Sequence, residues 1–415
     1  MVDSLQDFAG DVRPTRSSIL SQKTKAILLL LFAEMAGMSL WFQSAAVLAD
    51  MAREGGLDAT RQALMSSVVQ AGFVLGALLI AITGIADRLD PRKVFALSAI
   101  AAAAANLSLL ALPIGGDAAI AARFLTGVLL AGVYPVGMKI AVGWGTRDRG
   151  LLVGSLVAAL TLGKALPYLA AYVGDTEWRP AVVVISLLAA LGGLLAFTIR
   201  LGPHHARAAA FRPQAIALAW TDRRIRRAYI GYLGHMWELY VMWAWIGTAA
   251  AISYAATRSA ADAESLAKLT AFAAIALGAV FCVPAGWLAD RIGKAEVTIL
   301  ALVVSGSAGL ATAATFGGPV WITATLMILW GIAIVPDSAQ FSAIVADSAP
   351  PEFAGSLLTF QTALGFALTA VTVQFAPTAA ASIGWPALLA GLALGPAIAI
   401  VAMVPLTRAA HAPKP

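Results

Sequence analysis

The sequence predicts an all-α membrane protein in which twelve transmembrane helices form two pseudo-symmetric six-helix bundles. Of its 415 residues, 60% are hydrophobic and 12% are charged, and the mean hydropathy is +0.83. A water-soluble protein of this composition would lack the polar residues to cover its surface. Apolar runs recur along the whole chain, and each is long enough to cross about 30 Å of hydrocarbon as a helix.

Twelve such runs are separated by short polar connections. We expect the spans at approximately 26–48, 63–86, 94–112, 118–143, 150–173, 178–200, 227–252, 266–289, 296–314, 319–345, 353–377 and 383–406. The polar first 25 residues show no pattern typical of a cleavable signal. The single cysteine, Cys282, excludes an intramolecular disulfide, and its apolar setting is typical of a small buried residue.

The distribution of basic residues predicts that both termini are cytoplasmic. With the N-terminus inside, the cytoplasmic connections hold most of the Lys and Arg residues, including the cluster between Arg223 and Arg227. The outer segments hold only Arg53, Arg61, Arg179, Arg258 and Lys268. The net charge of +6 is therefore a topology signal. We expect Arg223 to Arg227 to contact anionic lipid headgroups and not nucleic acid.

The chain contains an internal repeat. The segment "VGSLVAALTLGKAL" from Val153 aligns with "AGSLLTFQTALGFAL" from Ala354, 201 residues later, and Pro135 and Pro336 have the same offset. Such a repeat predicts two bundles with a path between them. Pro336 also predicts a kink in the tenth span, because a proline frees a backbone carbonyl. The predicted parts are a cytoplasmic N-terminal segment (1–25), an N-terminal bundle (26–200), a cytoplasmic linker (201–225), a C-terminal bundle (226–406) and a cytoplasmic tail (407–415).

Two loop motifs connect this plan with a known family. Residues 286–294, "GWLADRIGK", match the pattern G-x-L-A-D-R-x-G-R/K, and a second copy follows the second span with Thr83, Asp90 and Pro91 as departures. The chain resembles the major facilitator superfamily of secondary transporters over its whole length. Several strings, among them "GHMWELYVMWAWIG", are similar to a bacterial subgroup of nitrate/nitrite or cyanate permease-like proteins. The resemblance implies gating loops that contain Asp87, Arg88, Arg92, Asp290, Arg291 and Lys294.

Ionisable residues inside the predicted spans indicate the functional site, because such residues are costly in the bilayer unless they face a cavity or one another. In the family, the first, fourth, seventh and tenth spans line the central cavity. The proton-coupling candidates on these spans are Glu34, Arg123, His235, Glu238 and Asp337, and Arg123 begins an R-x-x-x-G motif that the family associates with ion coupling. His235 and Glu238 are three residues apart and can share a proton. The alternative is that the carboxylates are permanently paired and structural.

Lys164 lies about 21 Å from the cytoplasmic start of the fifth span, which is too deep for easy snorkelling. It needs a partner, which is either an anionic substrate or an internal carboxylate of Glu34 or Glu238. By contrast, Lys139 is near a span end, so snorkelling explains it. The other candidate substrate contacts are Trp41, Gln43, Tyr134, Trp237, Tyr240, Gln340 and Gln361, beside the wall residue Trp243. The alternative for the aromatic residues is ordinary packing.

These observations predict a secondary active transporter that moves a small polar anion by alternating access, as residues 1–200 rock against residues 226–415, with coupling to protons. The alternative is a proton-driven exporter of cationic or amphiphilic compounds. An enzyme is not expected, because the spans carry no nucleophile–base pair, metal cluster or paired histidines. We expect no cofactor and no metal. A monomer suffices, because the path lies within one chain.

Overall fold

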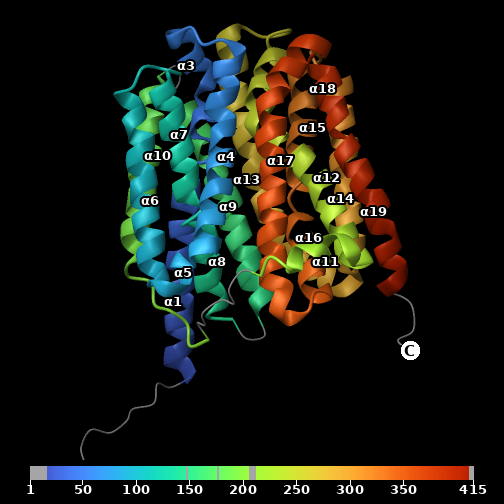
Figure 1. The fold of residues 1–415 in the computed structure, drawn as a ribbon. Helices are drawn as coiled ribbons and strands as arrows, with labels where there is room; N and C mark the ends of the chain where they lie inside the picture. The colour runs from blue at the N-terminus through green and yellow to red at the C-terminus, as the bar shows by residue number, and fades with distance from the viewer. Residues whose placement is uncertain (1–15, 146–147, 175–176, 205–211, 411–415) are drawn as a thin grey trace, which may run out of the picture.

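The computed structural model describes residues 16–145, 148–174, 177–204 and 212–410, and the regular structure of these residues is helical throughout (Figure 1). Two bundles stand side by side, one blue to green and one yellow-green to red. The described ends of the chain, in α1 and α19, lie on the same side of the molecule, whereas the short helix α3 lies on the other. This arrangement agrees with an even number of spans.

The N-terminal bundle holds the first six spans. Its helices are α1 (Arg16–Met38), α2 (Gln43–Ala46), α3 (Leu48–Gly55), α4 (Ala59–Thr83), α5 (Ile85–Arg88), α6 (Pro91–Leu107), α7 (Asp117–Leu130), α8 (Tyr134–Val142), α9 (Arg149–Val173) and α10 (Trp178–Ala196), with a 3-10 turn at Ser108–Leu110.

The C-terminal bundle repeats this order. Its helices are α11 (Ala215–Thr221), α12 (Arg223–Tyr254), α13 (Ala260–Ile292), α14 (Lys294–Ala314), α15 (Val320–Ala333), α16 (Ser338–Ser348), α17 (Pro351–Ile383), α18 (Trp385–Leu392) and α19 (Leu394–Ala410). The predicted linker, 201–225, thus contains α11, and the seventh span already begins at Arg223.

Ten of the described helical segments are long and apolar enough to cross a membrane. The two remaining spans of the family plan are α1 and α12. Both have lower hydropathy because they begin with basic residues and carry Glu34, or His235 and Glu238, in their interiors. Buried polar residues therefore weaken the hydropathy signal in these two helices.

Three central spans are interrupted. The tenth span breaks between α15 and α16 at Pro336, as its proline predicts, and the fourth breaks between α7 and α8 just before Pro135. The first span was predicted over 26–48 as one helix. Instead it starts at Arg16, ends at Met38 and continues after a turn as α2. The equivalent seventh span, α12, runs unbroken for 32 residues, so the repeat is asymmetric here.

The two bundles meet along two helix pairs, α9 with α13 and α4 with α17, and these four helices occupy the middle of the molecule (Figure 1). Within the N-terminal bundle, α4 packs closely on α7 through glycines. A side chain at Gly72 would collide with the Phe124 carbonyl, and one at Gly127 would collide with the Val69 carbonyl. The glycine of the R-x-x-x-G motif is therefore required by backbone contact between helices.

We expect Gly127→Ala to lower the unfolding free energy by roughly 1–3 kcal/mol, because the methyl group forces α4 and α7 apart. The matched control is Gly154→Ala in α9, where a methyl group meets no atom within 4 Å. Thermal unfolding of the purified variants measures both. Equal melting temperatures for the two variants would contradict the packing argument.

Candidate functional site

The side chain of Lys164 lies at the contact between the bundles. It projects from α9 and is 1% exposed. Its ammonium nitrogen is 4.4 Å from the ring centroid of Trp41, 4.6 Å from that of Tyr240 and 5.1 Å from that of Trp243, and it donates a hydrogen bond to the Tyr240 hydroxyl at 2.5 Å. Trp41 belongs to the N-terminal bundle and the other two rings to α12. Both halves therefore surround one cation, and we call these three rings the Lys164 cage.

Further aromatic residues close the cage. The ring of Phe73 lies 4.9 Å from Trp41 and 4.7 Å from Phe366, and Phe366 lies 5.2 Å from Tyr240, centroid to centroid. Phe73 is on α4 and Phe366 on α17, so this layer also joins the two halves. It excludes water from the ammonium, which strengthens cation–π attraction to about 2 kcal/mol or more in a desolvated site.

No carboxylate pairs with Lys164 among the described residues, so neither predicted internal partner forms an ion pair with it in this conformation. Glu34 is near enough for its charge to interact with that of Lys164. However, both Glu34 carboxylate oxygens are buried without a hydrogen-bond partner, and the side chain abuts Gly137 of α8. A buried carboxyl group without hydrogen-bond partners is costly, so the structural alternative of a permanent pair has no contact to support it at Glu34.

Glu238 has a different environment. Its carboxylate accepts hydrogen bonds from the Trp330 indole at 2.7 Å and from the Ser305 hydroxyl at 3.1 Å, and all three residues belong to the C-terminal bundle. These contacts favour the structural alternative for this carboxylate.

His235 does not contact Glu238. Its Nε2 atom is 2.7 Å from the Ser338 hydroxyl, and its Nδ1 atom is 3.0 Å from the Asp337 carboxylate. The latter pair is close but poorly aligned for a hydrogen bond. The three-residue spacing places His235 and Glu238 on neighbouring parts of α12, but each points to a different helix. The hypothesis of a shared proton therefore has no direct contact to support it.

Arg123 supports the break in the first span. Its guanidinium donates to the carbonyl oxygens of Leu40 at 3.0 Å and Trp41 at 2.8 Å, and to the side chain of Asn106 at 2.7 Å. The side chain is fully buried, and no carboxylate bonds to it among the described residues. In the second half, Ala324 occupies the equivalent position, 201 residues later, and α12 is unbroken there. Arg123 thus holds Trp41 in place at the cage.

Two other predicted substrate contacts, Gln43 and Trp237, lie in different environments. Gln43 is fully buried, and both its amide atoms lack partners, as do the indole nitrogens of Trp41 and Trp243. Gln43 belongs to α2, which packs against α9 and α12, so these groups lie near the cage. By contrast, Trp237 is 38% exposed on the outer surface and its indole approaches the Gly391 carbonyl at 3.4 Å. This position favours the packing alternative for Trp237.

Three further candidates lie on α8, α16 and α17. Tyr134 is half-buried at the start of α8, Gln340 is buried near the start of α16, and Gln361 accepts a hydrogen bond from Ser342 at 3.3 Å. Sequence analysis missed Phe73, Phe366 and Tyr168, whose hydroxyl donates to the Trp243 carbonyl at 2.6 Å. Only Tyr168 had a detectable signal, because it is four residues after Lys164 and shares its helical face.

Comparison with known proteins agrees with this architecture. The family model described as Major Facilitator Superfamily matches residues 27–371. The chain belongs to the major facilitator superfamily. Among solved structures it is similar to a point mutant of nucleoside transporter NupG, with a TM-score of 0.70, 14% identity, and 92% of this chain and 99% of that chain covered. NupG itself gives a TM-score of 0.67 at 14% identity, covering 92% and 98%. No curated protein matches the sequence.

Polar contacts join the two halves on the side opposite the chain ends. Lys268 of α13 binds Asp50 at 2.9 Å, Arg53 binds Glu264 at 2.9 Å, and Ser67 donates to Gln374 at 2.5 Å. Burial raises the pKa of Asp50, and the hydrogen bond from Lys268 opposes this shift.

The loops that the superfamily motif implies as gates make local contacts. Arg92 pairs with Asp90 at 2.6 Å, which lowers the pKa of Asp90, and Lys294 pairs with Asp347 at 2.5 Å within the C-terminal bundle. Arg291 stacks on the Trp287 ring, 3.6 Å from its centroid. Arg88 and Asp290 are exposed, and the side chain of Asp87 lies outside the described part of the chain. Their role as gates stays a prediction.

We expect Arg123→Met to destabilise the protein by several kcal/mol, because it leaves the Leu40 and Trp41 carbonyls unpaired at roughly 1–3 kcal/mol each. Ala324→Met is the matched control, since it places the same side chain at the equivalent position beside an unbroken helix. Thermal unfolding compares the two. If Arg123→Met were no more destabilising than Ala324→Met, the guanidinium would not support the break.

Proposed function

We propose that this secondary transporter moves a small polar anion across the bacterial inner membrane, with both termini in the cytoplasm, and that it couples transport to protons. Lys164 carries the proposal, because it is a buried cation that no carboxylate neutralises among the described residues. A single subunit contains the whole cage, so a monomer suffices for function.

The cage gives Lys164 a partner in only one conformation. Trp41 and Lys164 belong to one half, and Tyr240 and Trp243 belong to the other. When the halves separate on the outer side, the ammonium loses two of its three rings and its hydrogen bond. An anion that enters from outside can then replace them, with the unpartnered groups of Gln43, Trp41 and Trp243 available as hydrogen-bond donors. Substrate binding would thus stabilise the conformation that Lys164 alone disfavours.

For proton coupling, the geometry supports Glu34 over Glu238. The Glu34 carboxylate is unpartnered and near Lys164, whereas Trp330 and Ser305 hold Glu238 within its own bundle. An ionised Glu34 competes with the substrate for the ammonium, and a protonated Glu34 does not. Binding of the proton would therefore favour binding of the anion, which is the requirement for symport.

One observation favours the second candidate, an exporter of cationic or amphiphilic compounds. Three aromatic rings around an ammonium form a cation-binding arrangement. A cationic substrate would displace Lys164 from the cage. The two candidates therefore differ in whether the substrate attracts the lysine or replaces it.

We expect an anionic ligand to raise the melting temperature of the wild-type protein and to leave that of Lys164→Gln unchanged. A ligand at 100 times its Kd stabilises the folded state by about 2.7 kcal/mol, and the variant lacks the charge that binds it. The panel contains small anions and cationic drugs, and Lys139→Gln, in the fourth span, is the control that should keep the response.

Retained stabilisation by the anion in Lys164→Gln would contradict the role of the lysine. Stabilisation by cations alone, undiminished in Lys164→Gln, would replace the anion proposal by the exporter.

For coupling, we expect Glu34→Gln in proteoliposomes to exchange substrate across the membrane but to lose accumulation driven by a pH gradient, because its side chain stays neutral. Glu238→Gln should retain coupled accumulation, since its amide oxygen can still accept the bond from Trp330 and its amide nitrogen can donate to the Ser305 hydroxyl. Uptake of the labelled substrate with and without the gradient measures both. Loss of coupled accumulation in Glu238→Gln and its retention in Glu34→Gln would assign the coupling proton to Glu238 instead.

A further inference from the structure

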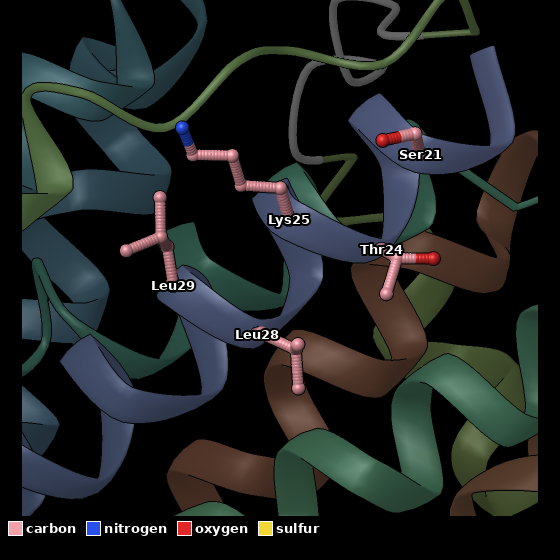
Figure 2. A pocket seen from close by; sticks show the side chains of 5 residues that line it. All are labelled: Ser21, Thr24, Lys25, Leu28 and Leu29. Carbon is pink, nitrogen blue, oxygen red and sulfur yellow. The ribbon is translucent and has the colours of Figure 1, made fainter. Parts of the chain in front are cut away.

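A basic pocket lies far from the cage, at the cytoplasmic end of α1. It has a volume of about 240 Å³ and is lined by Gln22, Lys25, Ala26, Leu29, Thr198 and Arg200. It adjoins a wider groove of about 580 Å³ along α1, which shares Lys25 and Leu29 and adds Ser21, Thr24 and Leu28 (Figure 2). In Figure 2, the side chains of Lys25 and Leu29 leave α1 on the same side. The volume of the smaller pocket equals that of about eight water molecules in the liquid, which is enough for a phosphodiester group.

The pocket has a positive charge that no described acidic residue neutralises. Among the described residues, the side chains of Lys25 and Arg200 make no ion pair or hydrogen bond, and no carboxylate lines the pocket. Nearby basic residues differ in this respect. Lys23 pairs with Asp148 at 2.6 Å, and Arg92 pairs with Asp90 at 2.6 Å. Two free basic side chains beside the polar groups of Gln22 and Thr198 suit a phosphate.

The position of the pocket along the helices matches the membrane boundary. The apolar run of α1 begins at Ala26, directly after Lys25, and α10 ends at Ala196, shortly before Thr198 and Arg200. Both basic residues therefore lie at headgroup depth on the cytoplasmic side. One turn deeper, Leu28 is 62% exposed and Leu29 is half-buried, which provides an apolar groove next to the charges. Basic pockets between helices at this boundary bind anionic lipid headgroups.

We propose that this pocket binds the phosphate of an anionic phospholipid of the cytoplasmic leaflet, with Lys25 and Arg200 on the phosphate and an acyl chain along Leu28 and Leu29. The apolar groove favours a lipid over a free phosphate ion, which would leave the leucines uncovered. The bound lipid bridges α1 and the end of α10. Because α1 also carries Glu34, the lipid stabilises the helix that positions the proposed coupling group.

The test titrates the purified full-length protein in detergent with dioleoylphosphatidylglycerol, dioleoylphosphatidylcholine or inorganic phosphate, and native mass spectrometry measures binding. We expect the phosphatidylglycerol to bind and the double variant Lys25→Gln/Arg200→Gln to bind it roughly 30-fold more weakly, or about 2 kcal/mol at 1.4 kcal/mol per factor of ten. The control is Lys93→Gln/Lys139→Gln, which removes two basic residues near the same boundary of the same bundle but outside the pocket. It should bind like the wild type.

An equal loss in both double variants would mean general attraction to a basic surface and would overturn the pocket. Inorganic phosphate that binds wild type as tightly as the lipid would overturn the lipid assignment. A photoreactive phosphatidylglycerol provides a second readout on the unmodified protein. Cross-linked peptides should come from the first half of α1 and residues 197–201, and labelling confined to other helices would contradict the proposal.

Discussion

An ammonium group buried in the bilayer requires partners at every step of transport, and this requirement on Lys164 governs the centre of the structure. In the conformation described, its partners are three rings and a hydroxyl contributed by both halves. Any motion that separates the halves at this level therefore removes partners from the cation. The position of the two bundles and the chemical environment of one side chain are thus coupled, which is the physical basis for a ligand to shift the conformation.

The cage in turn depends on a break in the first span. A continuous helix through residues 39–42 would place Trp41 according to helical periodicity, whereas the turn sets its ring against Lys164. The break frees two carbonyl groups in a fully buried region, and Arg123 bonds to both. One buried cation, Arg123, thus stabilises the backbone that shields another, Lys164. The unbroken α12, with Ala324 in place of the arginine, shows that the repeat alone does not require the break.

The features that the sequence predicted are those with local causes. Apolar runs and the 201-residue repeat predicted the spans and the two bundles, and Pro336 predicted the break in the tenth span, because a proline acts on its own helix. The break in the first span was not predictable in this way, since its stabilising residue is 83 positions later. Likewise, spacing placed His235 and Glu238 together but contained no information on the helices they face. Phe73 and Phe366 resemble ordinary core residues in sequence, and only the packing of two bundles brings them to the cage.

The two halves differ in how their buried polar groups are satisfied, and this difference assigns them different parts in transport. In the C-terminal bundle, Glu238 bonds within its own half, and so do His235 and Asp337, so these contacts survive a rigid rotation of the bundle. In the N-terminal bundle, Glu34 has no hydrogen-bond partner and Lys164 depends on rings from the opposite half. Rocking therefore leaves the C-terminal networks unchanged and alters the environment of Glu34 and Lys164. A ligand can shift the conformational equilibrium only through groups whose environment differs between the two states. If the proposed coupling to a proton and an anion holds, Glu34 and Lys164 of the N-terminal half are therefore the groups that carry it.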